Sequence, residues 1–211
     1  MRLDISEGWR GISPILKKKY GNQGWFNRIQ IYLLNRHSQI QQRLLTSFNY
    51  VELHPKNATS FSYEYSSLLR DIGSAFSSFL DSIIKLSSFK KGKLNINDYC
   101  AFLIKEVDDI EEICAEINAE YDQRYLFPFH CIKKFNPHWW DAYNNVKHTD
   151  IENLEDGCLG NVLYGFASLS ILKNLSVWTK FNAIFEIGVH RNLKVGNDTL
   201  WKKYVFPVFK Q

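Results

Sequence analysis

The residue types most suited to chemistry are concentrated in residues 136–148, where polar side chains recur at helical spacing. One face of a helix over these residues would carry only polar side chains, because residues three and four positions apart are neighbours on a helix surface. Its members are Asp141, Asn144, Asn145 and His148. A histidine can transfer a proton and amide groups can hold oxygen atoms, so this face could hold a phosphate group.

Two further faces of the same helix differ in character. One combines aromatic rings with a cation, which suits a nucleobase and its phosphate; its members are Trp140, Tyr143 and Lys147. The other is apolar and is predicted to face the core; its members are Trp139, Ala142 and Val146. A simpler interpretation is that His148 places a cation at a helix C-terminus and that the polar face meets water.

Three helices are predicted to build and position this site. Asn136 as N-cap and Pro137 at the first helical position open the helix itself. Before it, residues 65–84 keep apolar side chains at helical spacing, and Ser62 stands where an N-cap belongs. After it, residues 159–172 form a second strongly apolar helix. The two apolar helices are therefore expected to form the core.

Other segments have less regular patterns. Residues 25–45 indicate a helix that is interrupted near residues 36–37, and residues 48–53 indicate a short extended piece that ends in a turn. In the loop before the last strong helix, Asn153 and Asp156 have the spacing of a capping box. We therefore expect this loop to end in a capped helix.

The middle and the end of the chain are harder to assign. A helix is predicted over residues 97–120, followed by an extended connection over residues 121–135 that Pro128 interrupts. Residues 181–188 could be a helix, and residues 204–209 could be a closing strand or a docked tail. These alternatives stay open on the sequence alone.

The bulk composition indicates one domain over residues 1–211, with a core over about residues 25–178. Residues 1–24 look like an irregular arm, and residues 179–211 form a tail of uncertain structure. Hydrophobic residues at 45% and charged residues at 23% are ordinary globular values. The net charge of +4 and the pI of about 8.8 tolerate a polyanionic partner without demanding one.

The four cysteines indicate the compartment. No two of them have CxxC or metal-knuckle spacing, and no secretory leader is visible, so they are expected to be reduced thiols of a cytoplasmic protein. The longest apolar run, residues 162–172, is too short to span a bilayer, so no membrane partner is expected. No cofactor is expected either. A metal site made of His138, Asp141, His148 and Asp150 could be imagined, but chance proximity at a surface explains these residues better.

The sequence around the site resembles a known family. Residues 137–148 read PHWWDAYNNVKH and precede a polar loop and a long apolar helix. This is similar to a bacterial branch of the HEPN superfamily, whose members often read P-x-WW-x-x-YN-x-x-KH here. Residues 57–76, with FSYEY at residues 61–65, resemble the upstream stretch of that branch. The likeness covers about residues 48–173.

The resemblance implies an all-α, HEPN-like helical bundle that is usually a homodimer. It also implies RNA binding and, in many members, metal-independent endoribonuclease activity in phage defence or in a toxin–antitoxin system, with an antitoxin or another protein as partner. The family motif has an Arg four to six residues before a His. His148 matches that histidine and Asn144 the polar residue after the Arg. The Arg itself would fall at Tyr143, or nearby at Asp141 or Ala142, and none of these is basic. Lys147, or Arg70 from the earlier helix, could supply the missing charge.

Together these patterns and the resemblance define a candidate site and leave its function open. The expected catalytic residues are His148, Asn144 and Lys147, and the expected substrate-binding residues are Tyr143, Asn145, Trp140 and Arg70. The chain could cleave RNA or only bind it. It could instead be a non-catalytic dimeric or partner-binding interaction module, or a module that binds a nucleotide without cleaving it.

Overall fold

A computed structural model of the chain describes residues 24–86, 92–107, 109–117, 124–148, 151–176 and 185–189. The described part is mostly helical, which confirms the predicted class. The expectations for residues 1–23, for Asp150 and for residues 204–209 lie outside the described residues. In the described ranges no helix is both long and apolar enough to cross a membrane.

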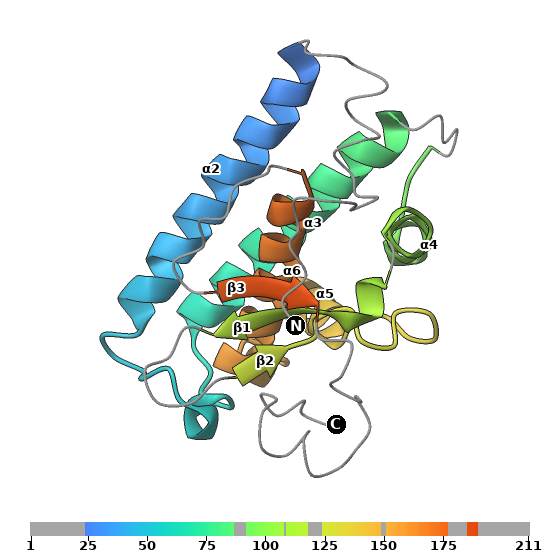
Figure 1. Cartoon of the computed structure of the whole chain (residues 1–211). Coiled ribbons are helices and arrows are strands. Elements are labelled where there is room, and N and C mark those ends of the chain that lie inside the picture. The colour runs from blue at the N-terminus through green and yellow to red at the C-terminus, as the bar shows by residue number, and fades with distance from the viewer. Residues whose placement is uncertain are drawn as a thin grey trace.

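Two long helices and a central one form the core. α2 (Gly24–Ser47) and α3 (Tyr63–Leu86) lie side by side, and α6 (Leu159–Ser176) packs against both (Figure 1). Nearly every residue of α6 is buried. A helix that is apolar all round belongs inside a protein, because any exposed side would leave apolar surface in water. The predicted core helices over residues 65–84 and 159–172 are both confirmed.

The shorter helices cover the ends of this core. α5 (His138–His148) packs against α3 and α6, and α4 (Ile96–Glu106) packs against α3. At the start of α4, the side chain of Asn95 accepts hydrogen bonds from the next turn while Asp98 accepts one from the Asn95 backbone. This capping box satisfies amides that have no partner within the helix.

A small sheet accompanies the helices. Its strands are β1 (Ile113–Ile117), β2 (Arg124–Leu126) and β3 (Phe185–Val189), in the order β2-β1-β3. Both pairings are antiparallel. β1 lies in the middle and contacts α6, so the sheet joins a segment from the middle of the chain to one near its end (Figure 1).

The helix predicted over residues 97–120 is confirmed up to Glu106, but its continuation into residues 113–117 is wrong. α4 ends at Glu106, the backbone turns through Asp109 at φ 54°, and the chain continues as β1. All five residues of β1 are buried. A short, wholly buried run has no alternation to separate a strand from a helix, so periodicity alone misassigns it. Residues 185–189, for which a helix was one option, also form a strand.

The predicted interruption of the first helix near residues 36–37 is also wrong, since α2 is continuous there. His37 is 3% exposed, and its Nε2 lies 2.9 Å from Ser170 Oγ on α6. The Arg36 guanidinium reaches Asp71 on α3 at 2.7 Å. These polar residues make contacts between helices, and nothing in their own sequence distinguishes that role from a helix break.

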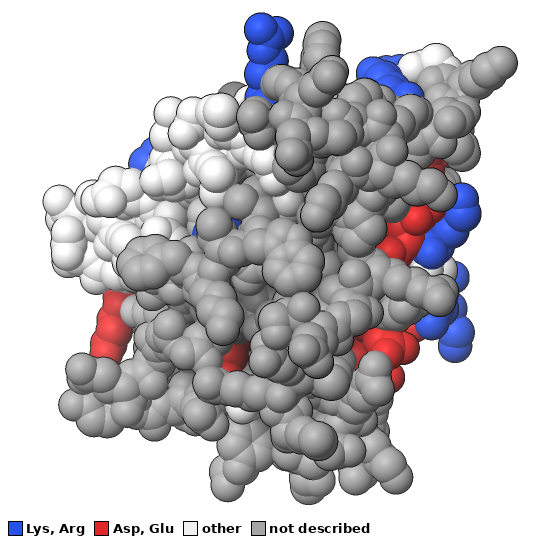
Figure 2. Space-filling model, turned by 45° about the horizontal axis from the view of Figure 1, so that its top comes forward, with Lys and Arg blue, Asp and Glu red and all other residues white. Residues whose placement is uncertain are grey.

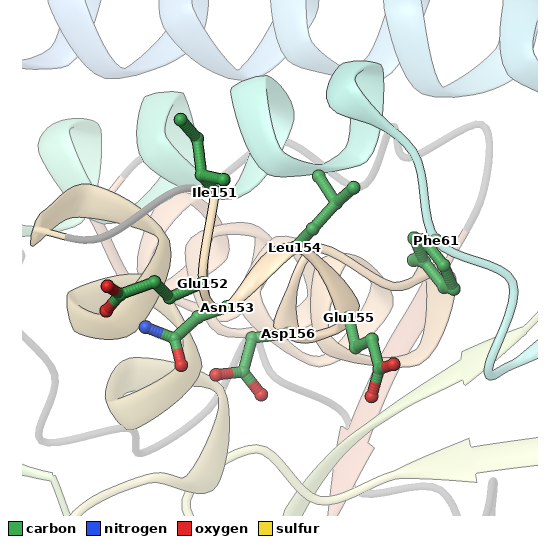
Figure 3. Close-up of a pocket in the computed structure, with 7 residues that line it drawn as sticks. All are labelled: Phe61, Ile151, Glu152, Asn153, Leu154, Glu155 and Asp156. Carbon is green, nitrogen blue, oxygen red and sulfur yellow. The ribbon is translucent and has the colours of Figure 1, made fainter.

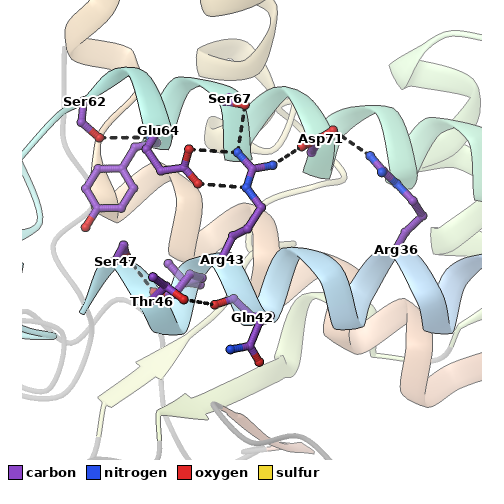
Figure 4. Close-up of polar contacts among 11 residues, drawn as sticks. Arg36, Gln42, Arg43, Thr46, Ser47, Ser62, Glu64, Ser67 and Asp71 are labelled. Carbon is purple, nitrogen blue, oxygen red and sulfur yellow. Dashed lines mark hydrogen bonds and ion pairs between the residues drawn. The ribbon is translucent and has the colours of Figure 1, made fainter. Parts of the chain in front are cut away.

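A cluster of charges joins α2 to α3 (Figure 4). Arg43 donates to both carboxylate oxygens of Glu64, at 2.9 and 3.1 Å, to Ser67 Oγ at 3.0 Å, and to Asp71. Asp71 also accepts a hydrogen bond from Arg36, which lies about two turns before Arg43 on α2. The bond to Glu64 raises the pKa of Arg43, against the lowering effect of its partial burial. The two helices are therefore held in one register by a bidentate, multi-charge contact.

The segment between α2 and α3 is a series of turns. The extended piece predicted over residues 48–53 is wrong, because residues 48–50 continue from α2 as tight turns with backbone hydrogen bonds to residues 45–47. The predicted turn is confirmed by a short 3-10 helix, η1 (Pro55–Asn57). The His54 imidazole caps this helix by accepting a hydrogen bond from the Lys56 amide.

Candidate functional site

The apolar face of α5 positions the candidate site. Trp139, Ala142 and Val146 are buried as predicted. Gly165 on α6 lets Trp139 approach closely, since a methyl group at this glycine would lie 3.2 Å from Trp139 Cε3. Gly73 on α3 has the same role toward Tyr143, because a methyl group there would overlap the phenol ring. α5 therefore docks through two glycines on its neighbours.

The aromatic face of α5 is also inside the protein. Trp140 is 7% exposed and Tyr143 is 5% exposed, with their ring centroids 5.0 Å apart. Trp140 makes an edge contact with Tyr99 of α4 and a tilted contact with Phe76 of α3. These rings form a shared core between three helices. They do not present a flat surface on which a base could stack.

The cation of this face remains accessible. Lys147 is exposed, and its Nζ lies 5.3 Å from the centroid of the Tyr143 ring. This cation–π contact holds an ammonium group over the buried ring, so the predicted ladder ends in a charge as expected. His148, the last residue of α5, is exposed as well.

The polar face of α5 divides into two parts. Asp141 and His148 are exposed and Asn144 is half-buried. Asn145 faces the following loop, where its Nδ2 donates to Asp156 Oδ2 at 2.8 Å. Asn145 thus fastens the helix to the loop.

The structure also brings Arg70 to the end of α5. Its Nη1 lies 3.4 Å from the carbonyl oxygen of Val146, a long hydrogen bond between α3 and the last turn of α5. Arg70 therefore reaches the helix end that carries Lys147 and His148. The carbonyl groups at a helix C-terminus carry partial negative charge, so cations there also stabilise the helix itself.

The loop after α5 does not form the predicted capping box. The Asn153 side chain makes no cap hydrogen bond, and a 3-10 helix, η3 (Leu154–Asp156), follows it. The Asp156 carboxylate is bonded to Asn145, and the Asp156 carbonyl accepts from Asn161 Nδ2 at 2.9 Å. Contacts with α5 and α6 decide the loop conformation, and spacing within the loop cannot reveal them.

A pocket of about 350 Å³ opens beside this loop (Figure 3). Its lining combines apolar and acidic side chains from two places in the chain. The lining residues are Phe61, Ile151, Glu152, Asn153, Leu154, Glu155 and Asp156. Through Asp156 the pocket adjoins the polar face of α5, but its charge is opposite to that of Arg70 and Lys147.

Sequence reasoning missed three contributors to this region. Gly73 stands inside a helical pattern, where a glycine often indicates that another element approaches closely. Asp156 was assigned to a capping box instead of to Asn145. Phe61 joins the pocket from the start of α3, and its backbone bridge to Cys158 on the far side of the pocket loop has no local signal.

The charges of the described surface are mixed. On the face drawn in Figure 2, the acidic and basic side chains of the described residues lie next to one another along one edge. Across the described ranges, no group of three or more His, Cys, Asp or Glu side chains is placed to hold a metal ion. None of the four cysteines forms a disulfide bond. Only Cys131 is partly accessible, and burial raises the pKa of the Cys100 thiol to about 12.

Comparisons of the chain with protein-family models, with curated proteins and with solved structures found no match.

Proposed function

We propose that this chain is a HEPN-like RNA-binding protein that contacts RNA at the C-terminal end of α5. The observation that carries the proposal is the position of Arg70, whose guanidinium lies against the turn that precedes His148. The HEPN-like motif has Tyr143 where the family has an arginine. Arg70 supplies a guanidinium to the same helix end from a different helix.

The chemistry open to this cluster is metal-independent cleavage of RNA. His148 would take the proton from the 2′-hydroxyl, whose oxygen bonds to phosphorus as the bond from phosphorus to the 5′-oxygen breaks, and the imidazole would return the proton to that departing 5′-oxygen. Arg70 and Lys147 would oppose the charge that develops on the phosphate, and Asn144 would donate a hydrogen bond to one of its oxygens. A second copy of the chain would complete the site if the protein forms the dimer that the resemblance implies.

The first test is RNA cleavage by the purified protein in EDTA. Wild type should cut a single-stranded RNA, and His148→Ala should lower the rate about 10²- to 10⁴-fold, since that is the usual contribution of a proton-transfer group. His138→Ala is the matched control, because it removes an imidazole from the other end of α5. Equal cleavage by wild type and His148→Ala would contradict the catalytic role.

RNA binding is tested separately by the salt dependence of affinity. Arg70→Gln and Lys147→Gln should each reduce the slope of log affinity against log salt by about one, because each removes one phosphate contact. Lys105→Gln is the control, since Lys105 is an exposed cation on α4. Unchanged slopes in both site variants would refute binding at this end of α5. A normal salt slope without cleavage would leave an RNA-binding protein that is not an enzyme.

The alternatives differ in their support. A bound nucleotide was suggested by the aromatic face of α5, but Trp140 and Tyr143 pack against Phe76 and Tyr99 and offer no stacking surface. A non-catalytic interaction module is favoured by a different observation, the exposed apolar side chains beside the pocket. Sedimentation of the purified chain tests the dimer, whose dissociation should depend on protein concentration.

A further inference from the structure

The pocket beside α5 has two chemically different edges. Figure 3 shows the apolar side chains of Ile151, Leu154 and Phe61 along one edge, and the carboxylates of Glu152, Asp156 and Glu155 along the other. The apolar edge runs along α3, and the acidic edge faces away from it. A molecule seated in the pocket would therefore meet apolar surface on one side and negative charge on the other.

The apolar edge is unusually exposed. Ile151 is 90% exposed and Phe61 is 49% exposed, and Tyr63, two residues further on, is also exposed. Burying a side chain of this size removes a large apolar area from water, which favours binding. Single exposed apolar residues are common, but a group of them that rims a pocket is typical of an interaction site.

The acidic edge determines which partner fits. Its carboxylates belong to Glu152, Glu155 and Asp156, and none of the described residues that line the pocket is a lysine or an arginine. Negative charge in a recess repels a polyphosphate chain and attracts cations. RNA is thus a poor occupant, whereas a protein segment with lysine or arginine side chains complements this edge.

The pocket is held in place by contacts to its surroundings. The Ser62 amide donates to the Gly157 carbonyl at 3.2 Å, and the Leu159 amide donates to the Ser60 carbonyl at 2.9 Å. Asn145 holds Asp156 from the side of α5. A surface that is already ordered loses little entropy when a partner binds, which favours affinity.

We propose that this pocket docks an amphipathic protein segment, with lysine or arginine along one side and apolar residues along the other. The apolar side packs on Ile151 and Phe61, and the cations pair with Glu152 and Glu155. The proposal does not depend on the proposed RNA site, because the two surfaces carry opposite charge and are formed by different residues.

The test uses three short fluorescent peptides and fluorescence anisotropy. The peptides alternate Lys with Leu, Glu with Leu, and Lys with Ser. Only the Lys–Leu peptide should bind wild type, because it alone has both the cations and the apolar groups. Ile151→Asp and Glu155→Lys should each weaken its binding about tenfold or more, which is about 1.4 kcal/mol. Added salt should weaken binding to wild type.

Matched controls separate this pocket from the general surface. Ile31→Asp makes the same change at an exposed isoleucine on α2, and Glu52→Lys makes the same charge reversal on the turn after α2. Both should bind the Lys–Leu peptide as wild type does. Thermal melting of each variant checks that it is folded. We expect all of them to fold, because the changed side chains are exposed.

Several results would overturn the proposal. The first is that the Lys–Leu peptide does not bind wild type. The second is that wild type and all variants bind the Lys–Leu peptide equally well. The third is that the Lys–Ser peptide binds wild type as tightly as the Lys–Leu peptide does. A wild-type dimer that dissociates on Ile151→Asp would assign the pocket to a second copy of the chain instead. RNA binding depends on Arg70 and Lys147 and not on the pocket residues, so failure of peptide binding and failure of the RNA proposal are distinguishable.

Discussion

At the scale of single residues, His37 shows how burial decides the behaviour of a titratable group. It lies between α2 and α6, stacked on the Phe166 ring with centroids 4.6 Å apart and bonded to Ser170. Burial, together with a smaller contribution from the nearby charge of Lys173, lowers the pKa of His37 to about 3. His37 is therefore neutral in the folded protein at neutral pH.

This burial predicts a loss of stability in acid. The pKa of His37 is lower in the folded chain than in the unfolded chain, so the unfolded chain binds more protons between about pH 6.5 and pH 3. The free energy of unfolding should fall in that range by up to about 1.4 kcal/mol per pH unit from this one group. Chemical denaturation at several pH values measures it.

The control for that experiment is the variant His37→Gln, whose free energy of unfolding is measured over the same pH range. Glutamine keeps a hydrogen-bonding side chain but does not titrate. Its unfolding free energy should depend less on pH between 6.5 and 4 than that of wild type, whatever its absolute stability. His138→Gln should keep the wild-type slope. An identical slope in wild type and His37→Gln would show that His37 is not the group responsible.

At the scale of elements, the position of α5 depends on a close approach to α3 at Gly73. Gly73→Ala should destabilise the protein by about 1 to 3 kcal/mol, since the new methyl group overlaps the Tyr143 ring and forces the helices apart. At an exposed helix position, a Gly-to-Ala change would instead raise the free energy of unfolding by about 1 kcal/mol. The sign of the measured change therefore tells whether Gly73 lies against Tyr143. Thermal and denaturant unfolding both measure it.

Two comparisons sharpen this prediction. Gly165→Ala should cost less than Gly73→Ala, because its methyl group would lie 3.1 Å from Ile72 Cγ2 and 3.2 Å from Trp139 Cε3, contacts that small shifts can relieve. Ser74→Ala, at the exposed neighbour of Gly73, should change stability little. A Gly73→Ala variant as stable as wild type would mean that α5 does not sit against α3 as described.

At the scale of the whole molecule, the sheet joins distant parts of the chain. Ala115 of β1 is opposite Ile187 of β3, and the chain passes through α5 and α6 between them. Ile187→Pro should reduce hydrogen-exchange protection of the amides of residues 113–117, because proline has no amide to donate and breaks the pairing. Ile187→Ala, which keeps the amide, should retain that protection. Equal protection in both variants would contradict the pairing.

Much of the helical fold could be predicted, and the reason is local. The apolar residues of α3 and of the apolar face of α5 recur at the helical period, and this period can be read within each segment alone. β1 was misassigned as helix because all of its residues are buried, so its pattern has no period to detect. His37 was taken as a sign of a helix break because its partner, Ser170, is far away in the sequence.

The candidate site was predicted as a set of residues but not as an arrangement. The sequence places Asn145 and His148 on one polar face, yet Asn145 turns to Asp156 in the next loop. It places Trp140 beside Lys147, yet Trp140 is enclosed by α3 and α4, and only the cation stays accessible. Which members of a face remain available depends on the elements that cover it.

The sequence by itself determined that most of the described part of the chain is helical and which side of α5 is apolar, because helix formation and amphipathic burial depend on neighbouring residues. Only the tertiary structure decided that Arg70 reaches the end of α5, that β1 pairs with β3, and that Phe61 and Ile151 share a pocket. Each of these contacts joins residues far apart in the chain. They form when the core packs, and no local pattern encodes them.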